Sequence, residues 1–339
     1  MNTRLRNAHL ATDSPFAMQH NSVPAFLSID VEPDAFQLSR NEAPAWAAFD
    51  AMVPFIEKLR ADLAVHNGAS PVFGWYIRTD PQIAEAYGHA DHGLHFYADR
   101  IAGFRSVGDY IGVHVHPLRW SESHQAWIHD FSDRQWLYDC TLSSLEGFAK
   151  AVGAPARHMR YGGGFLSNEI VDLAEAHGAV IDLTLEPVAS WALHTTVFPT
   201  SIDTSPIVGS FVNCEGAPRE PYQPDRDEFR VCRAYGRRTI VLLPLSSVLA
   251  SNQPDELPTA HMLYPSVPWP SPDFFWDLVW QQLRSMERPY LSLAIRTDAQ
   301  EVKRTAEMRK IFEALPGHPI AKHLRWVDPL EAIDSLVSS

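Results

Sequence analysis

The stretch 26–36, FLSIDVEPDAF, places three carboxylates after a run of β-favouring residues. Asp30, Glu32 and Asp34 are two positions apart, so as ionised groups at the end of one strand they repel one another. A bound divalent cation would relieve this repulsion. Acids that follow a strand can instead mark a helix start or a solvated turn, and Asp34 fits that alternative. The stretch therefore indicates a candidate metal or acid–base site.

The stretch 109–120, DYIGVHVHPLRW, supplies complementary ligands. If 110–116 is a strand, its period of two places His114 and His116 on one face. Two imidazoles there can converge on one ion, with nitrogen–metal distances of about 2.0–2.1 Å for zinc. Two histidines and one carboxylate leave positions open for water and substrate, as in catalytic zinc and non-haem iron sites. The alternative is a pair of buried, hydrogen-bonded histidines without a metal.

The composition indicates a soluble globular protein. The chain has 339 residues, of which 45% are hydrophobic and 20% charged, enough to build a full core. Its net charge of −13 argues against nucleic acid as a partner. No apolar run is long enough for a signal peptide or a transmembrane helix. Three scattered cysteines exclude a disulfide framework, and we expect a cytoplasmic protein. The sequence does not indicate an oligomeric state.

Apolar β-rich runs alternate with amphipathic stretches, which predicts an α/β fold with a parallel sheet and crossover helices. About eight strand candidates favour a (β/α) barrel. The predicted strands are 26–30, 72–78, 110–116, 158–162, 179–185, 239–245, 290–296 and 323–327, and the predicted helices are 46–65, 133–152, 167–177, 272–287 and 299–315.

The domain organisation follows from this rhythm. Residues 1–24 are polar and patternless and predict a flexible leader, followed by a single domain, 25–339. Residues 186–238 interrupt the alternation, and their length predicts a lid or wall over a site. The tetrapeptide Ile-Arg-Thr-Asp occurs at 77–80 and again at 295–298, each time closing a strand-like run. The carboxyl ends of strands are where α/β barrels place their chemistry.

Three motifs, in this order, resemble the polysaccharide deacetylase family (NodB homology, carbohydrate esterase family four). The first is SIDVEPD at 28–34. The second is GVHVHPLRW at 112–120, a His-x-His-Pro variant rather than the commoner His-x-x-x-His. The third begins MRYGGGFLSNEIVDLAEAHG at 159. The segment PYQPDRDEF at 221–229, with IVLLPLS after it, is similar to a segment of the His-x-His variants. The resemblance covers about 25–300.

This resemblance implies a distorted (β/α) barrel that binds one divalent metal ion, zinc by preference. The strand candidates give this barrel about seven to eight parallel strands, and the predicted insertion would cover its site. Asp30 would be the general base, oriented by an ion pair with Arg160. The metal ligands would be Glu32, His114 and His116. The predicted substrate-binding residues are Arg78, Trp120, Tyr161, Gly163 and Tyr222. The rings of Trp120 and Tyr161 could stack on a sugar, and packing in the core is the alternative for each.

One position departs from the family pattern. The late motif places a histidine after an apolar strand as the general acid, but the matching run here, YLSLAIRTD, carries Arg296. Arginine stays charged and is a poor proton donor, whereas it binds carboxylates and phosphates through its planar fork. We assign Arg296 to the catalytic set and expect it to grip an anionic group of the substrate. Asp298 as its partner within the protein is the alternative.

The preferred function is that of a metal-dependent hydrolase. It would remove an N-acetyl or N-formyl group from an aminosugar in the cytoplasmic assembly of a surface glycan such as O-antigen or capsule. The substrate would be a glycan or a nucleotide- or lipid-linked sugar. One alternative is a catalytically silent relative that binds glycan. Another is different amide chemistry on a modified anionic sugar.

Overall fold

The computed structural model describes most of the chain. The described residues are 22–34, 40, 43–187, 207–209, 214, 216–233, 235–250, 259–266, 268–298 and 302–337. The predicted leader lies outside them up to residue 21, and so does the part of the predicted insertion at 188–206.

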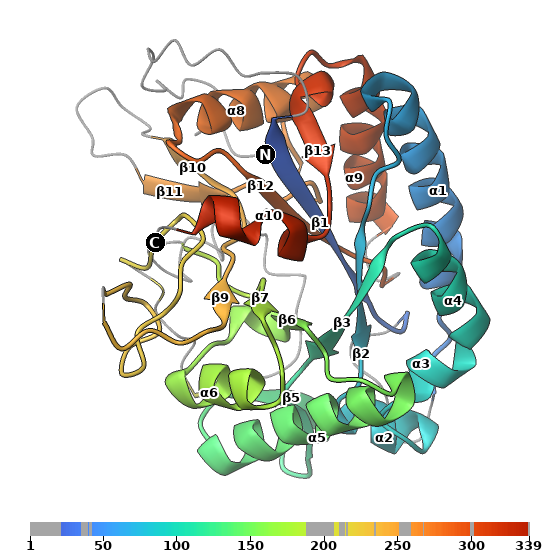
Figure 1. Cartoon of the computed structure of the whole chain (residues 1–339). Coiled ribbons are helices and arrows are strands. Elements are labelled where there is room, and N and C mark those ends of the chain that lie inside the picture. Colours follow the sequence, from blue (N-terminus) through green and yellow to red (C-terminus); the bar gives the residue numbers. More distant parts are fainter. Residues whose placement is uncertain are drawn as a thin grey trace.

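An eight-stranded parallel sheet forms the centre of the molecule, and each of its strands lies within or overlaps a predicted run. The strand order is β12-β1-β2-β3-β6-β7-β9, with β13 also paired to β1. The sheet curls into a distorted, incomplete (β/α) barrel, which confirms the predicted fold class (Figure 1). Its strands are β1 (Val23–Val31), β2 (Gly74–Arg78), β3 (Tyr110–Val115), β6 (His158–Tyr161), β7 (Ile181–Asp182), β9 (Val241–Leu242), β12 (Leu291–Arg296) and β13 (Leu324–Trp326).

Strand β1 is the longest strand in the described part of the chain and pairs with three other strands. Its first residues pair with β13, its last residues pair with β2, and β12 runs along it from Ala25 to Asp30. The strand begins at Val23, so the last two residues of the predicted leader belong to the sheet. The leader boundary was wrong because Val23 and Pro24 are paired with Leu324 and Arg325 of the distant β13, which the local polar sequence does not show.

Most helices lie around the outside of the curled sheet, whereas α10 lies across the middle of the view, where its Ala332 and Leu336 share a cluster with Phe26 of β1 (Figure 1). The five predicted helices are present as α1, α5, α6, α8 and α9, close to the predicted bounds. Four further helices, α2, α3, α4 and α10, lie outside the predicted helix ranges. The helices are α1 (Ala47–Asn67), α2 (Pro81–Tyr87), α3 (His92–Phe96), α4 (Ala98–Ser106), α5 (Arg134–Val152), α6 (Asn168–Ala176), α8 (Pro272–Ser285), α9 (Val302–Ala314) and α10 (Pro329–Leu336), with 3₁₀ turns at Gly162–Gly164, Leu315–Gly317 and Ala321–His323.

Alternate residues of the strands face two different cores. Leu27 and Ile29 belong to the large apolar layer between the sheet and the helices. Phe26 and Tyr76 belong to a smaller cluster that also contains Tyr110, from the neighbouring strand. This smaller cluster lies on the inner face of the curled sheet. Because the period of a strand is two, Asp30 is on the same face as Phe26 and therefore also points inward. The fold thus carries the polar residues at the strand ends into the barrel.

Two small sheets flank the barrel. Strands β4 (Leu118–Ser121) and β5 (Ala126–Asp130) form a hairpin directly after the His-x-His motif, and β8 (Ile207–Val208) pairs with β5. Strands β10 (Ser247–Ala250) and β11 (Thr259–Met262) form the second pair. No helix in the described part of the chain combines the length and apolarity needed to cross a membrane.

The described part of the predicted insertion packs against α6. Asn168, at the start of α6, exchanges hydrogen bonds with the backbone of Asp227 and Phe229, and Arg238 donates to Asp172 at 2.7 Å. A covering role for this segment stays a prediction.

Candidate functional site

The carboxyl ends of five neighbouring strands bring the predicted site residues together. Asp30 on β1 lies opposite Arg296 on β12. His114 on β3 lies between Arg78 on β2 and Arg160 on β6. Parallel strands in register therefore place residues up to 266 positions apart on one edge of the sheet, and every one of these side chains belongs to the same inward row.

Glu32, His114 and His116 form the one group in the described residues whose ligand atoms could hold a metal ion. The two Nε2 atoms are 3.0 Å apart, and Glu32 Oε1 is 3.5 Å from each of them. Ligands at about 2.0–2.1 Å from a tetrahedral zinc ion would be about 3.3–3.4 Å from one another. The three atoms therefore have the spacing that such an ion requires.

The hydrogen bonds of this group prepare it for a cation. His114 Nδ1 lies 2.8 Å from the carbonyl oxygen of Arg160. A carbonyl only accepts, so Nδ1 carries the proton and Nε2 keeps its lone pair, the usual arrangement for a ligand histidine. Both oxygens of Glu32 are buried, and neither accepts a hydrogen bond from a described residue. Buried carboxylate oxygens normally have partners, so the residues present fit a metal ion.

Charge and burial set the protonation of two of these candidate ligands, Glu32 and His116. Burial alone would raise the pKa of Glu32, but the positive charge of Arg296, together with His116, holds that pKa well below its usual range. Burial lowers the pKa of His116 well below its usual value, against the attraction of Glu32. An ionised carboxylate and a neutral imidazole are the forms that bind metals.

Asp30 and Arg160 form a buried ion pair beside this group. Arg160 Nε donates to both carboxylate oxygens of Asp30, at 3.0 and 2.9 Å, and its Nη1 donates to the carbonyl oxygen of Leu183 at 2.8 Å. Asp30 Oδ1 lies 3.9 Å from His114 Nδ1. The guanidinium group of Arg160 is thus bonded on two sides, and it holds the Asp30 carboxylate in one orientation.

The predicted substrate-binding residues lie in different environments. Arg78 is fully buried and donates to Asp80 and Gln82, so it supports the site from within. Tyr161 is fully buried, and its hydroxyl accepts from Thr141 at 3.4 Å.

Tyr222 is buried in the apolar layer outside the sheet and donates to the carbonyl oxygen of Phe229 at 2.7 Å. The structure thus places Tyr161 and Tyr222 in the core, where aromatic rings with an internal partner pack. Trp120, partly exposed on the hairpin, and Gly163, in the turn after β6, stay candidates for substrate contact.

Arg296 has protein partners. Its Nε and Nη2 donate to the two oxygens of Asp298 at 3.1 and 3.0 Å, and Nε lies 3.2 Å from Glu32 Oε1. Asp298 as an internal partner is the alternative that the sequence left open, and these contacts support it. The side chain of Arg296 is 34% exposed.

Three residues near the site were not predicted. Gly162 packs against the ring of His116, and Thr297 bonds to the backbone of Glu32. His129, on the hairpin, is buried with its ring centroid 5.8 Å from that of His116. Burial, and then the charges of Arg78 and Arg296, lower the pKa of His129 to about 3. The Gly-Gly-Gly run in the sequence was a signal for Gly162, and the repeated Ile-Arg-Thr-Asp tetrapeptide was a signal for Thr297.

Asp34, the third carboxylate of the opening stretch, is separate from the site. Its two oxygens accept from the backbone N–H groups of Ala47 and Ala48 at the start of α1, at 2.9 and 2.8 Å. This is the helix-start role that the sequence left open for it.

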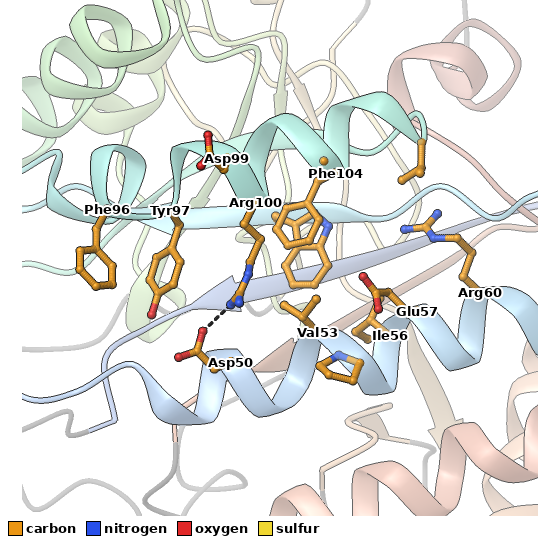
Figure 2. Close-up of a pocket in the computed structure, with 14 residues that line it drawn as sticks. Asp50, Val53, Ile56, Glu57, Arg60, Phe96, Tyr97, Asp99, Arg100 and Phe104 are labelled. Carbon is orange, nitrogen blue, oxygen red and sulfur yellow. Dashed lines mark hydrogen bonds and ion pairs between the residues drawn. The ribbon is translucent and has the colours of Figure 1, made fainter.

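A groove of about 760 Å³ lies on the outer surface of the barrel, between α1 and α4. Phe96 and Tyr97 line one end of it, and Arg100 reaches across to Asp50 (Figure 2). None of the residues at the strand ends lines this groove, so it is separate from the site.

Comparison with solved structures identifies the fold. A glycoside hydrolase/deacetylase from Parabacteroides distasonis aligns with a TM-score of 0.50 and 10% identity, over 94% of this chain and 69% of that one. A polysaccharide deacetylase from Mycobacterium smegmatis aligns with a TM-score of 0.47 and 12% identity, over 97% and 94%. An allantoinase aligns with a TM-score of 0.49 and 12% identity, over 91% and 88%. No protein-family model and no curated protein matches the sequence. The chain shares the fold of the first of these proteins, as the sequence resemblance implied.

Proposed function

We propose that the protein is a metal-dependent hydrolase that removes an acyl group, N-acetyl or N-formyl, from an aminosugar. The observation that carries the proposal is the position of the Glu32–His114–His116 group, with its ligand-like spacing, beside the Asp30–Arg160 pair. A metal-ligand set and a positioned carboxylate are the two parts that amide hydrolysis requires. The carbohydrate substrate comes from the motif resemblance.

Glu32, His114 and His116 would hold the divalent ion, with zinc the preferred identity. When bound, the ion supplies Lewis-acid chemistry to the acyl carbonyl and to the attacking water. The carbonyl of Arg160 fixes His114 through Nδ1 and keeps Nε2 directed at the ion. The hydrogen bond from His114 to this carbonyl supports the proposed ligand set, because it orients one of the three ligands.

Asp30 acts as the general base. It takes a proton from the water whose oxygen bonds to the acyl carbon, and Arg160 keeps both carboxylate oxygens oriented for that transfer. When the carbon–nitrogen bond breaks, the departing nitrogen needs a proton. Asp30 holds the proton it has just received and can return it, so one carboxylate serves both steps. The products are a free amine and a carboxylic acid.

The direct test is hydrolysis by metal-replete protein. Release of acetate or formate is measured from N-acetylated and N-formylated aminosugars presented free, nucleotide-linked and lipid-linked. The variant His114→Ala is the control without a complete ligand set, and metal content is measured on both proteins. Release by the parent and not by the variant supports the proposal. Stoichiometric metal without release from any of these substrates contradicts it.

Arg296 favours a second candidate, a protein that binds a glycan without hydrolysing it. A guanidinium group is a poor proton donor, so the late-motif acid is missing from β12. Saturable binding of an N-acetylated glycan by metal-replete protein, with no acid released, would establish this candidate.

A further inference from the structure

The tetrapeptide Ile-Arg-Thr-Asp ends the two strands that lie on either side of β1. Ile77 on β2 is opposite Val31, and Arg296 on β12 is opposite Asp30. Glu32 follows directly on β1, between the two copies. The two segments, 77–80 and 295–298, are called the flanking segments below.

The flanking segments have the same local structure. In each, the arginine forms a two-pronged ion pair with the aspartate two residues later, at 2.7 and 2.9 Å in the first copy and at 3.1 and 3.0 Å in the second. In each, the threonine amide extends the parallel pairing. Thr79 donates to the carbonyl oxygen of His114 at 3.3 Å, and Thr297 donates to that of Asp30 at 3.0 Å.

Both arginines reach the carboxylate of Glu32, one on each oxygen. Arg78 Nη1 lies 3.6 Å from Oε2, and Arg296 Nε lies 3.2 Å from Oε1. Oε1 is also the oxygen that is 3.5 Å from both ligand nitrogens. Two cations on opposite oxygens restrict the rotation of a carboxylate, because turning it would break both attractions.

The flanking segments also hold the backbone of two ligands. Thr297 Oγ1 accepts from the amide of Glu32 at 2.9 Å and donates to its carbonyl oxygen at 3.3 Å. Asp80 Oδ2 accepts from the amide of His116 at 3.2 Å. The three candidate metal ligands, Glu32, His114 and His116, are called the triad below. Both copies of the tetrapeptide contact this triad, through its backbone and through its side chains.

We propose that the flanking segments form a positioning device for the metal ligand Glu32, and that Arg296 is a positioning residue, the counterpart on β12 of Arg78 on β2. Arg296 occupies the acid position of the family pattern, but its contacts orient a ligand. This inference rests on the proposed function only in that a divalent ion occupies the triad. It assigns Arg296 neither proton donation nor the gripping of substrate.

Arg296→Lys separates orientation from charge. Lysine keeps the positive charge and loses the planar fork that holds Asp298 and Glu32 together. The Zn²⁺ dissociation constant should rise about 10- to 100-fold, the usual effect of losing a group that orients a ligand. The absorption spectrum of the Co²⁺-substituted protein should also change, because it reports the number and arrangement of the ligands.

Arg119→Lys is the matched control. Arg119 is 37% exposed, close to the 34% of Arg296, and is bound to Asp133 at 2.9 Å, but it has no contact with the triad. It should keep the parental Zn²⁺ affinity and Co²⁺ spectrum. A second variant, Asp298→Asn, keeps the shape of the partner and weakens its hold on Arg296. It should shift both readouts in the same direction as Arg296→Lys.

Parental Zn²⁺ affinity and an unchanged Co²⁺ spectrum in Arg296→Lys would overturn the inference. If instead only the KM for carboxylate- or phosphate-bearing substrates rises, Arg296 binds substrate and the positioning role is wrong. Failure of the parent protein to bind Zn²⁺ at all would contradict the proposed function itself, and this result is seen before any variant is compared.

Discussion

The ring of His116 packs directly against the backbone of Gly162. A β-carbon on Gly162 would lie 2.3 Å from Cε1 and 2.4 Å from each of the two ring nitrogens. Gly162 is buried at the start of the turn that follows β6. The glycine thus leaves the space that the His116 ring occupies, and a side chain at this position would displace the ring together with Nε2, its candidate ligand atom.

Gly162→Ala should displace His116 and weaken Zn²⁺ binding about tenfold or more, as expected when the orientation of a ligand is lost. Titration of the metal-free protein with Zn²⁺ measures this effect. Gly103→Ala is the control, since a β-carbon there meets no atom within 4 Å. Parental Zn²⁺ affinity in folded Gly162→Ala protein would show that the ring adjusts without cost.

The fold was largely predictable because strand–helix alternation is a local signal. All eight strands of the main sheet coincide with apolar β-rich runs of the sequence. Strands β7 and β9 are shorter than predicted, at Ile181–Asp182 and Val241–Leu242. Helices α2, α3 and α4 lie outside the predicted helix ranges, because they are short segments between β2 and β3 whose apolar residues show no extended helical period.

The candidate metal-ligand group was predictable in part, because the period of two on a strand places His114 and His116 on the same face in any fold. The partners of Arg296 were not predictable in the same way. The sequence offered Asp298 or a substrate. The contact with Glu32, 264 positions away, exists because β12 pairs with β1, whose partner residues are 266 positions apart. Contacts between strands depend on sheet order, which local patterns do not determine.

Asp30→Asn should abolish most hydrolysis while leaving the metal bound. Asparagine keeps the shape and can still accept from Arg160, but it cannot take a proton. The rate should fall about 10²- to 10⁴-fold, the usual contribution of a general base. Initial rates and metal content, measured on the same preparations, test this. Glu32→Gln is the comparison, and loss of metal from Asp30→Asn with retention in Glu32→Gln would mean that the two roles are exchanged.

Tyr222→Phe should lower stability and leave the KM unchanged. The hydroxyl of Tyr222 is buried and donates to the Phe229 carbonyl oxygen at 2.7 Å, so its removal leaves that acceptor unpaired at a cost of about 1–2 kcal/mol in the free energy of unfolding. Urea denaturation and steady-state kinetics measure the two quantities. Tyr235→Phe is the control, because Tyr235 is 89% exposed in the same region. A higher KM at parental stability would restore Tyr222 as a substrate-binding residue.

Asp182, at the end of β7, should make the protein less stable as the pH rises. It is fully buried, and its Oδ2 has no hydrogen-bond partner among the described residues. Burial raises its pKa from 3.8 to about 6, although the amide of Thr184 donates to Oδ1.

Because the pKa of Asp182 is higher in the folded state than in the unfolded state, the folded protein binds the proton more tightly. The stability that this provides is complete below about pH 4 and is lost as the pH rises through about 6. A shift of about two units corresponds to about 3 kcal/mol.

Asp182→Asn cannot ionise and keeps an acceptor for the Thr184 amide. Its free energy of unfolding, relative to that of the parent, should therefore increase by up to about 3 kcal/mol between pH 4 and pH 7. Urea midpoints at closely spaced pH values measure the difference. The change with pH is the informative quantity, because any constant offset from the new amide group cancels. If the difference stays the same from pH 4 to pH 7, the pKa of Asp182 is the same in the folded and unfolded states. The cost of burying its carboxylate would then be offset by an interaction other than the hydrogen bond from Thr184.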